Sequence, residues 1–428
     1  MSDTARGVEH TDSIDSHDST PKQPEKTKSR RPPNTAFRQQ RLKAWQPILT
    51  PKTVLPLFFT IGIIFAPIGG LLLYASSQVR EIKLDYTHCV NDAPDFSSSF
   101  ADMPGSAVDS AFKNANSSVR PQWAKKKDVN VTLHNGRQVK GNQCVLQFTI
   151  PEDMGAPVLF YYQLTNFYQN HRRYAESCDI QQLKGDARSY GDITGSKCTP
   201  LYGEDKDGTK KPYYPCGLIA NSMFNDSFSS PVWQNPPNDG KARTYNMTDK
   251  GIAWDSDKDL YGPTKYNSSQ ILPPPNWHDA YPDGYTDDGI SKPPNLKEWE
   301  AFQVWMRTAG LPTFSKLAMR NDADKLVSGI YQITIDDHFP TIEYKGTKSI
   351  LLTTRTVMGG RNNFLGIAYI AVGGVCILLG AIFTATHLIR PRKLGDHTYL
   401  SWNNAPTSKP SGPSTAMASG REIRPGDS

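Results

Sequence analysis

Two long apolar stretches constrain this chain more than any other feature. The first runs from Thr53 to Val79 without a charged residue and contains "VLPLFFTIGIIFAPIGGLLLY"; the second runs from Asn362 to Leu388, contains "FLGIAYIAVGGVCILLGAIFTAT" and has His387 near its end. A helix rises about 1.5 Å per residue, so each stretch exceeds the roughly 20 residues that cross about 30 Å of hydrocarbon. We therefore predict transmembrane helices at residues 53–77 and 362–389.

Two alternatives to membrane spans were weighed. A buried core helix of this length rarely lacks charge altogether, and a signal peptide would not begin behind a long polar tail. The mean hydropathy of −0.54 does not argue against two spans, because it averages over all 428 residues.

The flanking charges indicate how the chain crosses the membrane. Arg80 and Lys83, which follow the first span, are mixed with Glu81 and Asp85. Basic residues instead cluster on the outer sides of the two spans. The positive-inside rule then predicts that both termini are cytosolic and that the residues between the spans face the lumen or the exterior. The outer basic residues are Arg30, Arg31, Arg38, Arg41, Lys43, Lys52, Arg390, Arg392 and Lys393.

Glycosylation sequons and cysteines agree with this orientation. Five of the six cysteines lie between the spans, where an oxidising compartment permits disulfides, and Cys376 lies within the second span. All Asn-X-Ser/Thr sequons lie there too, although several would arise by chance in so long a segment. We predict glycosylation at Asn116, Asn130, Asn225, Asn246 and Asn267.

The stretch "FYYQLTNFYQNHRRY" mixes aromatic and basic residues, as single-stranded nucleic-acid binders do. The net charge is only +6, and a segment outside the cytosol meets no nucleic acid. We therefore predict no nucleic-acid partner. The same residues are rich in β-formers, so a strand with its rings in a core is the better interpretation.

The segments outside the spans differ sharply in composition. Residues 1–34 and most of the tail 390–428 are polar and rich in Ser and Pro, so we expect disorder. Residues 35–52 carry Phe37 and Trp45 among basic residues, which suits either a short interfacial helix or an ordinary basic flank. Residues 78–361 are expected to form one β-rich, antiparallel domain with some short helices.

Within that domain, four segments predict strands and one predicts a helix. "GIYQITIDDHFP" and "KSILLTTRTV" alternate apolar with polar residues, and "QCVLQFTIP" and "PVLFYYQLTNFY" are rich in β-formers. "NLKEWEAFQVWMRTAG" places Trp299, Phe302, Trp305 and Met306 largely on one helical face. Residues 202–294 are dense in Pro, Gly, Asp and Asn, so we expect mainly irregular structure.

Small residues recur along one face of each span. Gly366, Gly373 and Gly380 are seven residues apart, and Gly62, Ala66 and either Gly69 or Gly70 share a face of the first span. Small residues let a second helix approach closely in lipid. The stripes predict an interface either with a partner's helices or between the two spans themselves.

No catalytic motif was found. The sequence lacks G-x-S-x-G, H-E-x-x-H, Walker A and G-x-G-x-x-G patterns, so neither an enzyme activity nor a cofactor is predicted. "DSDKDLYG" begins like a calcium loop, but Leu260 and Tyr266 stand where that loop needs glycine and glutamate. The histidines show no metal-ligand spacing, so we predict no metal site.

Five cysteines between the spans leave the disulfide pairing open. Any one can be left out and the other four pair in three ways, which gives fifteen arrangements. Local spacing favours Cys198 with Cys216, which would leave Cys89 and Cys144 to close a longer loop and Cys178 unpaired.

Several whole segments resemble one family. "AWQPILTPKTVLPLFFTIGIIFAPIGGLLLYASSQVREIKLDYT", "YYQLTNFYQNHRRY", "PCGLIANSMFND", "VWMRTAGLPTFSKL" and "MGGRNNFLGIAYIAVGG" are similar to the accessory, or β, subunits of type-four P-type ATPases, the phospholipid flippases. The similarity extends from about Phe37 to Ile389. The long Ser/Pro tails and the segment "PPPNWHDAYPDGY" resemble fungal members.

The resemblance implies a non-catalytic subunit of a heterodimer. Such subunits bind a large catalytic P-type ATPase, help it leave the endoplasmic reticulum, and are needed when it moves phospholipid from the outer or lumenal leaflet to the cytosolic one. The family pattern also supports the pairs Cys198–Cys216 and, more loosely, Cys89–Cys144, and makes Asn225 the first sequon to carry over. Golgi, endosome and plasma membrane are the expected destinations.

The resemblance also suggests where the ATPase and membrane lipids would be contacted. We expect the glycine stripes to clamp the partner's helices, residues 37–51 to touch its cytosolic side, and a surface near residues 217–226 to cap its lumenal loops. The predicted interface residues are Phe37, Trp45, Gly62, Ala66, Gly217, Asn221, Phe224, Gly366, Gly373 and Gly380.

Two other classes of protein share the predicted topology. A trimeric ligand-gated channel with two spans would need a polar face to line its pore, and these spans lack one. A surface receptor would need a ligand-binding ectodomain but no obligate membrane partner. Neither class explains the quoted segments.

Overall fold

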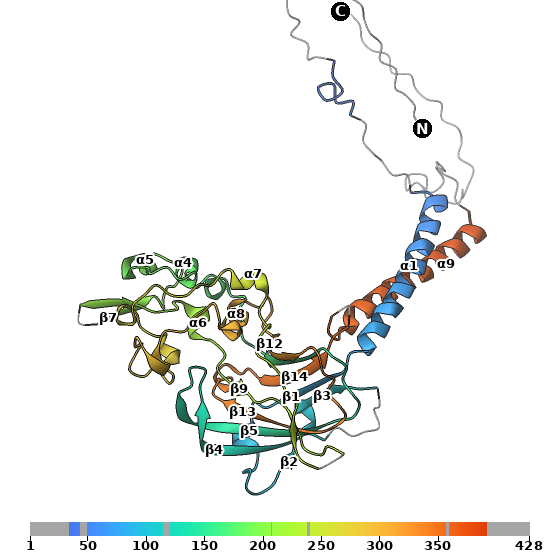
Figure 1. Cartoon of the computed structure of the whole chain (residues 1–428). Helices are drawn as coiled ribbons and strands as arrows, with labels where there is room; N and C mark the ends of the chain where they lie inside the picture. Colours follow the sequence, from blue (N-terminus) through green and yellow to red (C-terminus); the bar gives the residue numbers. More distant parts are fainter. Residues whose placement is uncertain are drawn as a thin grey trace, which may run out of the picture. The chain divides into compact units, whose positions relative to one another are not determined.

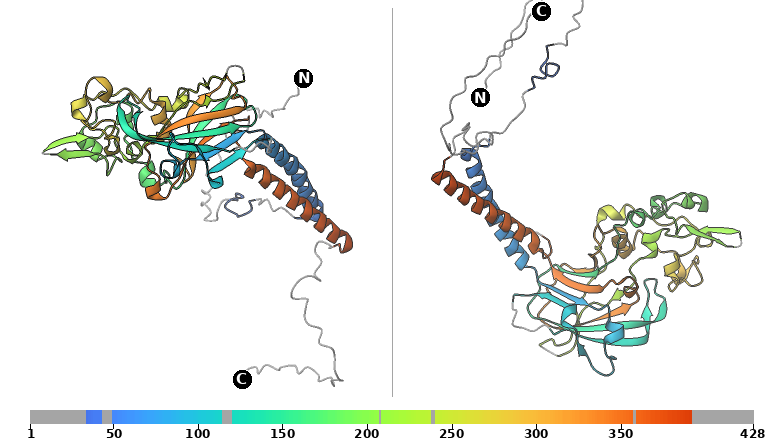
Figure 2. Two further views of the ribbon diagram at one scale, coloured as in Figure 1. Left: turned by 90° about the horizontal axis from the view of Figure 1, so that it is seen from below. Right: turned by 180° about the vertical axis from the view of Figure 1, so that it is seen from behind.

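The computed structural model describes residues 34–42, 49–113, 120–206, 208–237, 240–356 and 359–391. Its longest elements are two helices, α1 (Pro51–Ser77) and α9 (Asn363–Ile389), which lie side by side along much of their lengths (Figures 1 and 2). Both are apolar enough to cross a membrane, and most of their residues are not buried by the rest of the chain. A core helix of a soluble protein would be covered on all sides, so this exposure agrees with two membrane spans.

Between these helices the chain forms a β-rich domain built on two antiparallel sheets, which Figure 1 shows as stacked layers. One sheet has five strands in the order β12-β6-β14-β1-β3; the other has the order β11-β10-β13-β5-β4-β2, with β9 also pairing β13. The first sheet contains β1 (Glu81–Asp85), β3 (Val108–Ala111), β6 (Val158–Leu164), β12 (Phe314–Asn321) and β14 (Lys348–Thr354). The second contains β2 (Ala101–Asp102), β4 (Gln122–Thr132), β5 (Gln138–Ile150), β9 (Ser227–Phe228), β10 (Val232–Trp233), β11 (Arg243–Thr244) and β13 (Gly329–Asp337).

The main hydrophobic core lies between the two sheets. Alternate residues of each strand point inward, as the period of two in a strand requires. Phe160 of β6 and Leu352 of β14 meet Leu146 of β5 and Ile333 of β13 in one buried cluster. Because β1 and β14 are adjacent in the first sheet, the two chain segments that lead to α1 and α9 leave the same sheet side by side.

A second core is formed by aromatic side chains beneath the long loops. It packs around α8 (Glu300–Met306), in which every residue except Ala301 is buried. The shorter elements of the whole domain are β7 (Gly203–Lys206), β8 (Thr209–Pro212), α2 (Cys89–Asp92), α3 (Arg172–Ala175), α4 (Ile180–Leu183), α5 (Tyr190–Thr194), α6 (Leu218–Asn221), α7 (Asp255–Lys258) and 3₁₀ turns at Gly105–Ala107, Ser268–Gln270, Pro275–Trp277, Gly289–Ser291 and Ile342–Tyr344.

The predicted fold class is confirmed: two long apolar helices flank a β-rich antiparallel domain with short helices. The four predicted strands correspond to β5, β6, β13 and β14, and the predicted helix contains α8. The strands β4 and β12 were missed.

The residues before Pro56 and after Thr386 form a separate unit, in whose described part Phe37 is exposed. Trp45 and Asn116 lie outside the described residues.

Candidate functional site: the helix pair and the domain it carries

The glycine stripes of α1 and α9 face each other. A side chain added at Gly373 would place its Cβ 3.1 Å from the Ala66 backbone nitrogen, and one at Gly62 would lie 3.0 Å from the Gly373 carbonyl oxygen. At Gly69 the corresponding distance to the Gly366 carbonyl oxygen is 2.8 Å. The glycines therefore allow the two backbones of one chain to touch, which is a main source of helix association in lipid.

This contact changes the role expected for the stripes. Gly62, Ala66, Gly366, Gly373 and Gly380 were predicted to contact a partner, with mutual packing of the spans as the alternative. The structure has the alternative: Gly380 packs against Phe59, and the other glycines pack as described above. Gly70 and Gly374, the sequence neighbours of two stripe glycines, have no heavy atom within 4 Å of an added Cβ. Close approach by a partner helix therefore has room on other faces of the pair.

Hydrogen bonds join the helix pair to the first sheet. The Ser76 hydroxyl donates to the Asn363 side chain at 2.6 Å and accepts from the Asn362 backbone at 3.0 Å. Just beyond, the Thr354 amide donates to the Arg80 carbonyl at 2.9 Å. Since β1 and β14 pair directly after these contacts, both helices are tied to one ladder of the sheet.

The segment "PCGLIANSMFND" is partly buried in the domain, and the contact surface expected at residues 217–226 stays a prediction. Gly217 has φ +99°, and an added Cβ would lie 2.1 Å from the Ser177 carbonyl oxygen. Phe224 is buried and stacks on Tyr162 with centroids 4.0 Å apart. The Asn221 side chain accepts from the Asn276 backbone at 2.9 Å. Gly217 and Phe224 therefore hold loops together, while Asn221 is half-buried and Asn225 is exposed.

Two disulfides cross-link the domain, one between α2 and β5 and one within the loops. The structure joins Cys89 to Cys144, 55 residues apart, and Cys198 to Cys216, 18 residues apart, the two pairs that the sequence favoured. Cys178 carries no disulfide. Burial and the neighbouring Asp179 carboxylate raise the pKa of its thiol, which keeps it protonated and unreactive.

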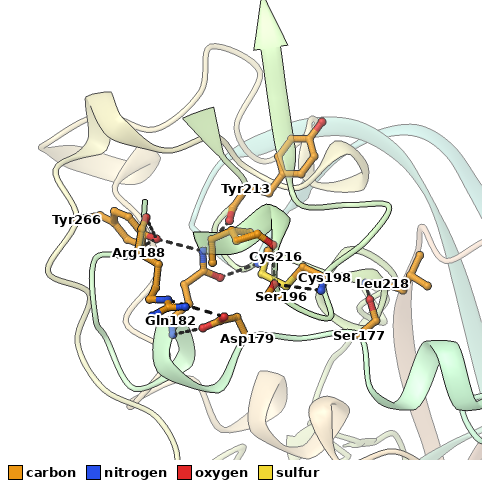
Figure 3. Close-up of a disulfide and its surroundings, with 11 residues drawn as sticks. Ser177, Asp179, Gln182, Arg188, Ser196, Cys198, Tyr213, Cys216, Leu218 and Tyr266 are labelled. Carbon is orange, nitrogen blue, oxygen red and sulfur yellow. Dashed lines mark hydrogen bonds and ion pairs between the residues drawn. A yellow bond between two sulfur atoms is a disulfide. The ribbon is translucent and has the colours of Figure 1, made fainter. Parts of the chain in front are cut away.

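A buried glutamine organises the surroundings of the second disulfide (Figure 3). The Gln182 side chain accepts from the Cys216 backbone at 2.8 Å and donates to the Tyr213 carbonyl at 2.8 Å. The Tyr266 hydroxyl accepts from the Arg188 backbone at 2.8 Å. The bridge thus fixes a hydrogen-bonded network as well as two chain segments, and its loss would release both.

A buried ionic cluster links the two sheets to the loop that carries Asn225. The Lys348 ammonium donates to Asp226 at 2.8 Å, to Asp337 at 2.6 Å and to the Phe339 carbonyl at 2.7 Å. The other Asp226 oxygen accepts from the His338 and Phe339 backbones, both at 2.6 Å. Tyr86 donates to Asp226 at 2.8 Å.

One ammonium in this cluster serves two carboxylates, those of Asp226 and Asp337. Burial alone would lower the pKa of Lys348, but the Asp226 and Asp337 carboxylates outweigh it and raise the pKa above the ordinary value. Burial and the Asp226 charge raise the pKa of Tyr86, which therefore remains a donor. Sequence reasoning missed this cluster. Its one signal is Lys348, the only charged residue of a strand that is buried at six of its seven positions.

Helix α8 is held at both ends by charged side chains. The Glu300 carboxylate accepts from the backbones of Ile252 at 2.8 Å and Ala253 at 3.0 Å. Lys316 of β12 donates to the carbonyls of Val304, Trp305 and Arg307 at 2.9, 2.7 and 2.5 Å. The last carbonyls of a helix have no partner within it, so Lys316 supplies a cap from another element.

Replacing Lys316 by methionine should destabilise the domain by about 2 kcal/mol, since the buried carbonyls at the end of α8 would lose their donor. Burial and the Arg307 charge lower the pKa of Lys316 from 10.5 to about 7. Between about pH 7 and 10.5 the unfolded chain therefore binds the extra proton, so this lysine makes stability rise with pH. Thermal unfolding of the wild type and of K316M across that range should show their difference growing with pH. A difference that stays constant would contradict the lowered pKa.

The sequon asparagines in the described part of the chain are all at the surface. Asn130 lies on β4 and Asn225 lies beside the ionic cluster, while the remaining two lie in loops. An accessible side chain is what glycan transfer requires. Glycosylation of Asn130, Asn225, Asn246 and Asn267 therefore remains a sterically allowed prediction.

Comparison with known proteins identifies the family. A model of the LEM3 (ligand-effect modulator 3) family, also named the CDC50 family, matches residues 72–393. The match covers more than half of the chain. The chain belongs to the LEM3/CDC50 family. The residues matched by the family model include α9 and the whole β-rich domain, as did the resemblance noted in the sequence. The similarity is therefore not limited to the apolar helices.

Individual LEM3/CDC50 relatives are similar over nearly their whole length. A Chaetomium thermophilum protein named phospholipid-transporting ATPase accessory subunit CDC50 is 44% identical over 376 residues, which cover 87% of this chain and 91% of that protein. The Saccharomyces cerevisiae accessory subunit CRF1 is 44% identical over 381 residues, covering 89% and 91%. The Mus musculus cell cycle control protein 50A is 38% identical over 371 residues, covering 83% and 88%.

Family membership confirms the predicted resemblance, including its fungal members. Together with α1 and α9, it makes the chain a two-pass membrane protein. Among the described residues, no group of three or more His, Cys, Asp or Glu side chains is arranged to hold a metal ion.

Proposed function

We propose that this chain is the non-catalytic accessory subunit of a phospholipid-transporting P-type ATPase. The observation that carries the proposal is the similarity over nearly the full length of two fungal proteins that are named accessory subunits of such ATPases. The ATPase chemistry, in which phospholipid moves from the lumenal or outer leaflet to the cytosolic one, belongs to the partner. The accessory subunit supports the partner's exit from the endoplasmic reticulum, its stability and its activity.

The proposed orientation places both termini in the cytosol and the β-rich domain in the lumen or outside the cell. The flanking charges, the two disulfides and the exposed sequons support this orientation. The complex would travel from the endoplasmic reticulum to the Golgi, endosomes and plasma membrane. Residues 37–51 would then touch the cytosolic side of the partner.

The geometry favours a subunit whose helix pair and β-rich domain are joined rigidly. Because the stripe glycines are used within the helix pair, partner helices would contact the other faces, where Gly70 and Gly374 leave open space. The bonds between Ser76 and Asn362–Asn363 and the β1–β14 ladder fix the domain to both helices. Such a subunit can hold a partner's membrane helices and lumenal loops in one arrangement.

The proposal is tested by purifying the tagged chain in mild detergent and identifying what co-purifies in stoichiometric amount. We expect a single large P-type ATPase. Cys198→Ser should reduce its recovery severely, because the bridge contributes about 3 kcal/mol and fixes the Gln182 network. Cys178→Ser, the same change at an unbridged cysteine, should leave recovery unchanged.

A homo-oligomer with no ATPase would contradict the subunit proposal. In that case conductance measurements on the reconstituted chain would test the ligand-gated channel. A monomer without any membrane partner would instead favour a surface receptor.

A further inference from the structure

A groove runs across the outer face of the five-stranded sheet. Two adjoining hollows of about 310 and 480 Å³ share Tyr161, Leu317, Ile252 and Trp254 among their lining residues, so they form one depression. Its floor is the side of β6 and β12 that faces away from the core. Its wall is the segment from Gly251 to Lys258, which includes α7.

The lining of the groove contains more basic than acidic side chains. It has five basic residues, of which Lys316 has its pKa lowered to about 7 by burial, and one carboxylate, that of Asp255. Carboxylates pair with three of the basic residues: Lys258 with Asp255 and Glu300, both at 3.5 Å, Arg307 with Asp257, and Arg320 with Asp322 at 2.7 Å. The basic residues of the lining are Lys258, Arg307, Lys316, Arg320 and Arg355.

Arg355 differs from the other cations of the groove. It is exposed, and within the described part of the chain it makes no hydrogen bond or ion pair. Arg320 and Arg355 both lie near the phenol of Tyr161: burial raises the pKa of Tyr161, and the two guanidinium charges oppose that rise. Both guanidiniums and the Tyr161 hydroxyl line the same hollow, and Arg320 also donates to the Gly251 carbonyl at 2.8 Å and to Asp322 at 2.7 Å.

An exposed tryptophan completes the wall. Trp254 is 62% exposed, and the Arg307 guanidinium lies over its ring at 3.4 Å from the centroid. This stacking holds the indole in place while leaving its other face open. Tryptophan and tyrosine are the side chains that settle at the headgroup level of a membrane.

The strand register places this groove next to the membrane. Helix α1 is 27 residues and so about 40 Å long, which matches a bilayer with its headgroups. Strand β1 begins at Glu81, four residues after the end of α1, which is at most about 14 Å of chain. In the five-stranded sheet Glu81 of β1 pairs with Thr353 of β14, Thr353 pairs with Leu159 of β6, and Leu159 pairs with Arg320 of β12.

Neighbouring strands are about 4.8 Å apart, so Arg320 lies about 14 Å from Glu81, measured across the strands along this row of paired residues. Arg355 follows the same row on the side that leads to α9. The cationic end of the groove is therefore at the edge of the sheet from which both membrane helices leave.

We propose that this groove binds the phosphodiester of a phospholipid headgroup in the leaflet beside the β-rich domain. Arg320, Arg355 and Tyr161 donate hydrogen bonds to the phosphate oxygens, and Trp254 rests at the level of the glycerol backbone. Guanidinium pairs match phosphate oxygens in geometry and charge. The unpaired guanidinium of Arg355 favours an anionic group, and the position beside the helix ends favours one that the membrane supplies.

This inference goes beyond the proposed subunit role and requires only that the chain spans a membrane. It gives the domain a lipid contact of its own, distinct from its contacts with the ATPase. Headgroups held here would be kept beside the helix pair.

Photocrosslinking of the full chain, with whatever partner it carries, tests the proposal. Leu317, which lines both hollows, is replaced by benzoylphenylalanine, and the protein is reconstituted into vesicles of phosphatidylcholine and phosphatidylserine. Mass spectrometry should find the groove peptide carrying a phospholipid. The same photoreactive residue at Ile290, an exposed turn outside the groove, measures background.

Arg355→Gln should lower the lipid adduct about tenfold, as the loss of roughly 1.4 kcal/mol of charge-assisted binding predicts. Arg173→Gln removes an exposed arginine outside the groove and should have no effect. Since Arg355 has no described partner, R355Q should keep the fold, which an unchanged unfolding temperature verifies. Continued co-purification of the ATPase would separate the lipid site from the subunit role.

Three results would overturn the proposal. The first is a lipid adduct no stronger than at Ile290. The second is a crosslink to a partner polypeptide in place of lipid, which would make the groove a protein-docking surface. The third is Arg355-dependent binding of inorganic phosphate without any lipid adduct, which would assign the groove to soluble phosphates.

Discussion

Lys348→Met is expected to destabilise the β-rich domain by about 3–5 kcal/mol, because it leaves buried carboxylates without their cation. Lys348 and Asp226 are 3% and 0% exposed, so water cannot replace the lost ammonium. The same change removes the donor to the Phe339 carbonyl. We expect little folded K348M protein in membranes or in detergent extracts of them. The measurement is the unfolding temperature of the purified variant, together with its resistance to limited proteolysis.

A matched control separates burial from the loss of a lysine. Lys325 pairs with Asp153 at 2.7 Å, but its side chain is 62% exposed. Lys325→Met should therefore change stability by no more than about 1 kcal/mol. Equal losses for K325M and K348M would mean that the ionic cluster contributes nothing special to the fold.

A compensating variant tests the charge argument directly. Replacing Asp226 and Asp337 by asparagine in the K348M background removes the unpaired charges while retaining side chains that accept hydrogen bonds. Stability should recover in part, since breaking a buried ion pair from one side costs more than replacing it whole. No recovery at all would show that the hydrogen bonds from the His338 and Phe339 backbones require the Asp226 carboxylate itself.

The cluster also shows where sequence reasoning reaches its limit. Alternation predicted β13 and β14 because one face of each strand is buried, and length without charge predicted both membrane helices. Strand β4 was missed because "KKKD" interrupts its pattern, where Asp128 has φ +52° and the register shifts. Strand β12 was missed because a lysine, Lys316, occupies one of its buried positions. Its amino group donates to carbonyls of α8, of which that of Val304 lies twelve residues earlier in the chain.

The interface predictions had a different weakness. A motif such as "PCGLIANSMFND" indicates that its residues are constrained, but not by what. For Gly217 the constraint is the Ser177 carbonyl, and for Phe224 it is the ring of Tyr162, both distant in sequence. The seven-residue spacing of glycines likewise predicted a close helix contact without naming the second helix. Only the three-dimensional arrangement distinguishes a core residue from a contact residue in such segments.

Gly69→Leu is expected to force α1 and α9 apart. An added Cβ would lie 2.8 Å from the Gly366 carbonyl oxygen and 2.9 Å from the Ile370 nitrogen, and both are backbone atoms that cannot rotate away. Overpacking of this kind costs about 1–3 kcal/mol, and separation also forfeits the van der Waals packing that holds helices together in lipid. The partner ATPase should be lost with it, because the pair would no longer present one fixed surface.

Gly70→Leu is the matched control, since it makes the same change one residue further along the same helix. An added Cβ there has no heavy atom within 4 Å, so the helix pair should stay intact. Oxidative crosslinking of Phe65→Cys with Tyr369→Cys in a Cys376→Ser background reports the contact, because the two native rings are 5.0 Å apart. We expect the crosslink in G70L and its loss in G69L.

Co-purification of the ATPase with the two variants then separates two roles for the glycines. If G70L keeps the crosslink but loses the ATPase, the open face of α1 is where a partner helix approaches. If G70L keeps both, the partner uses other faces of the pair. If G69L keeps both the crosslink and the ATPase, close packing of α1 on α9 is not what holds this subunit together, and the stripe's role would have to be sought elsewhere.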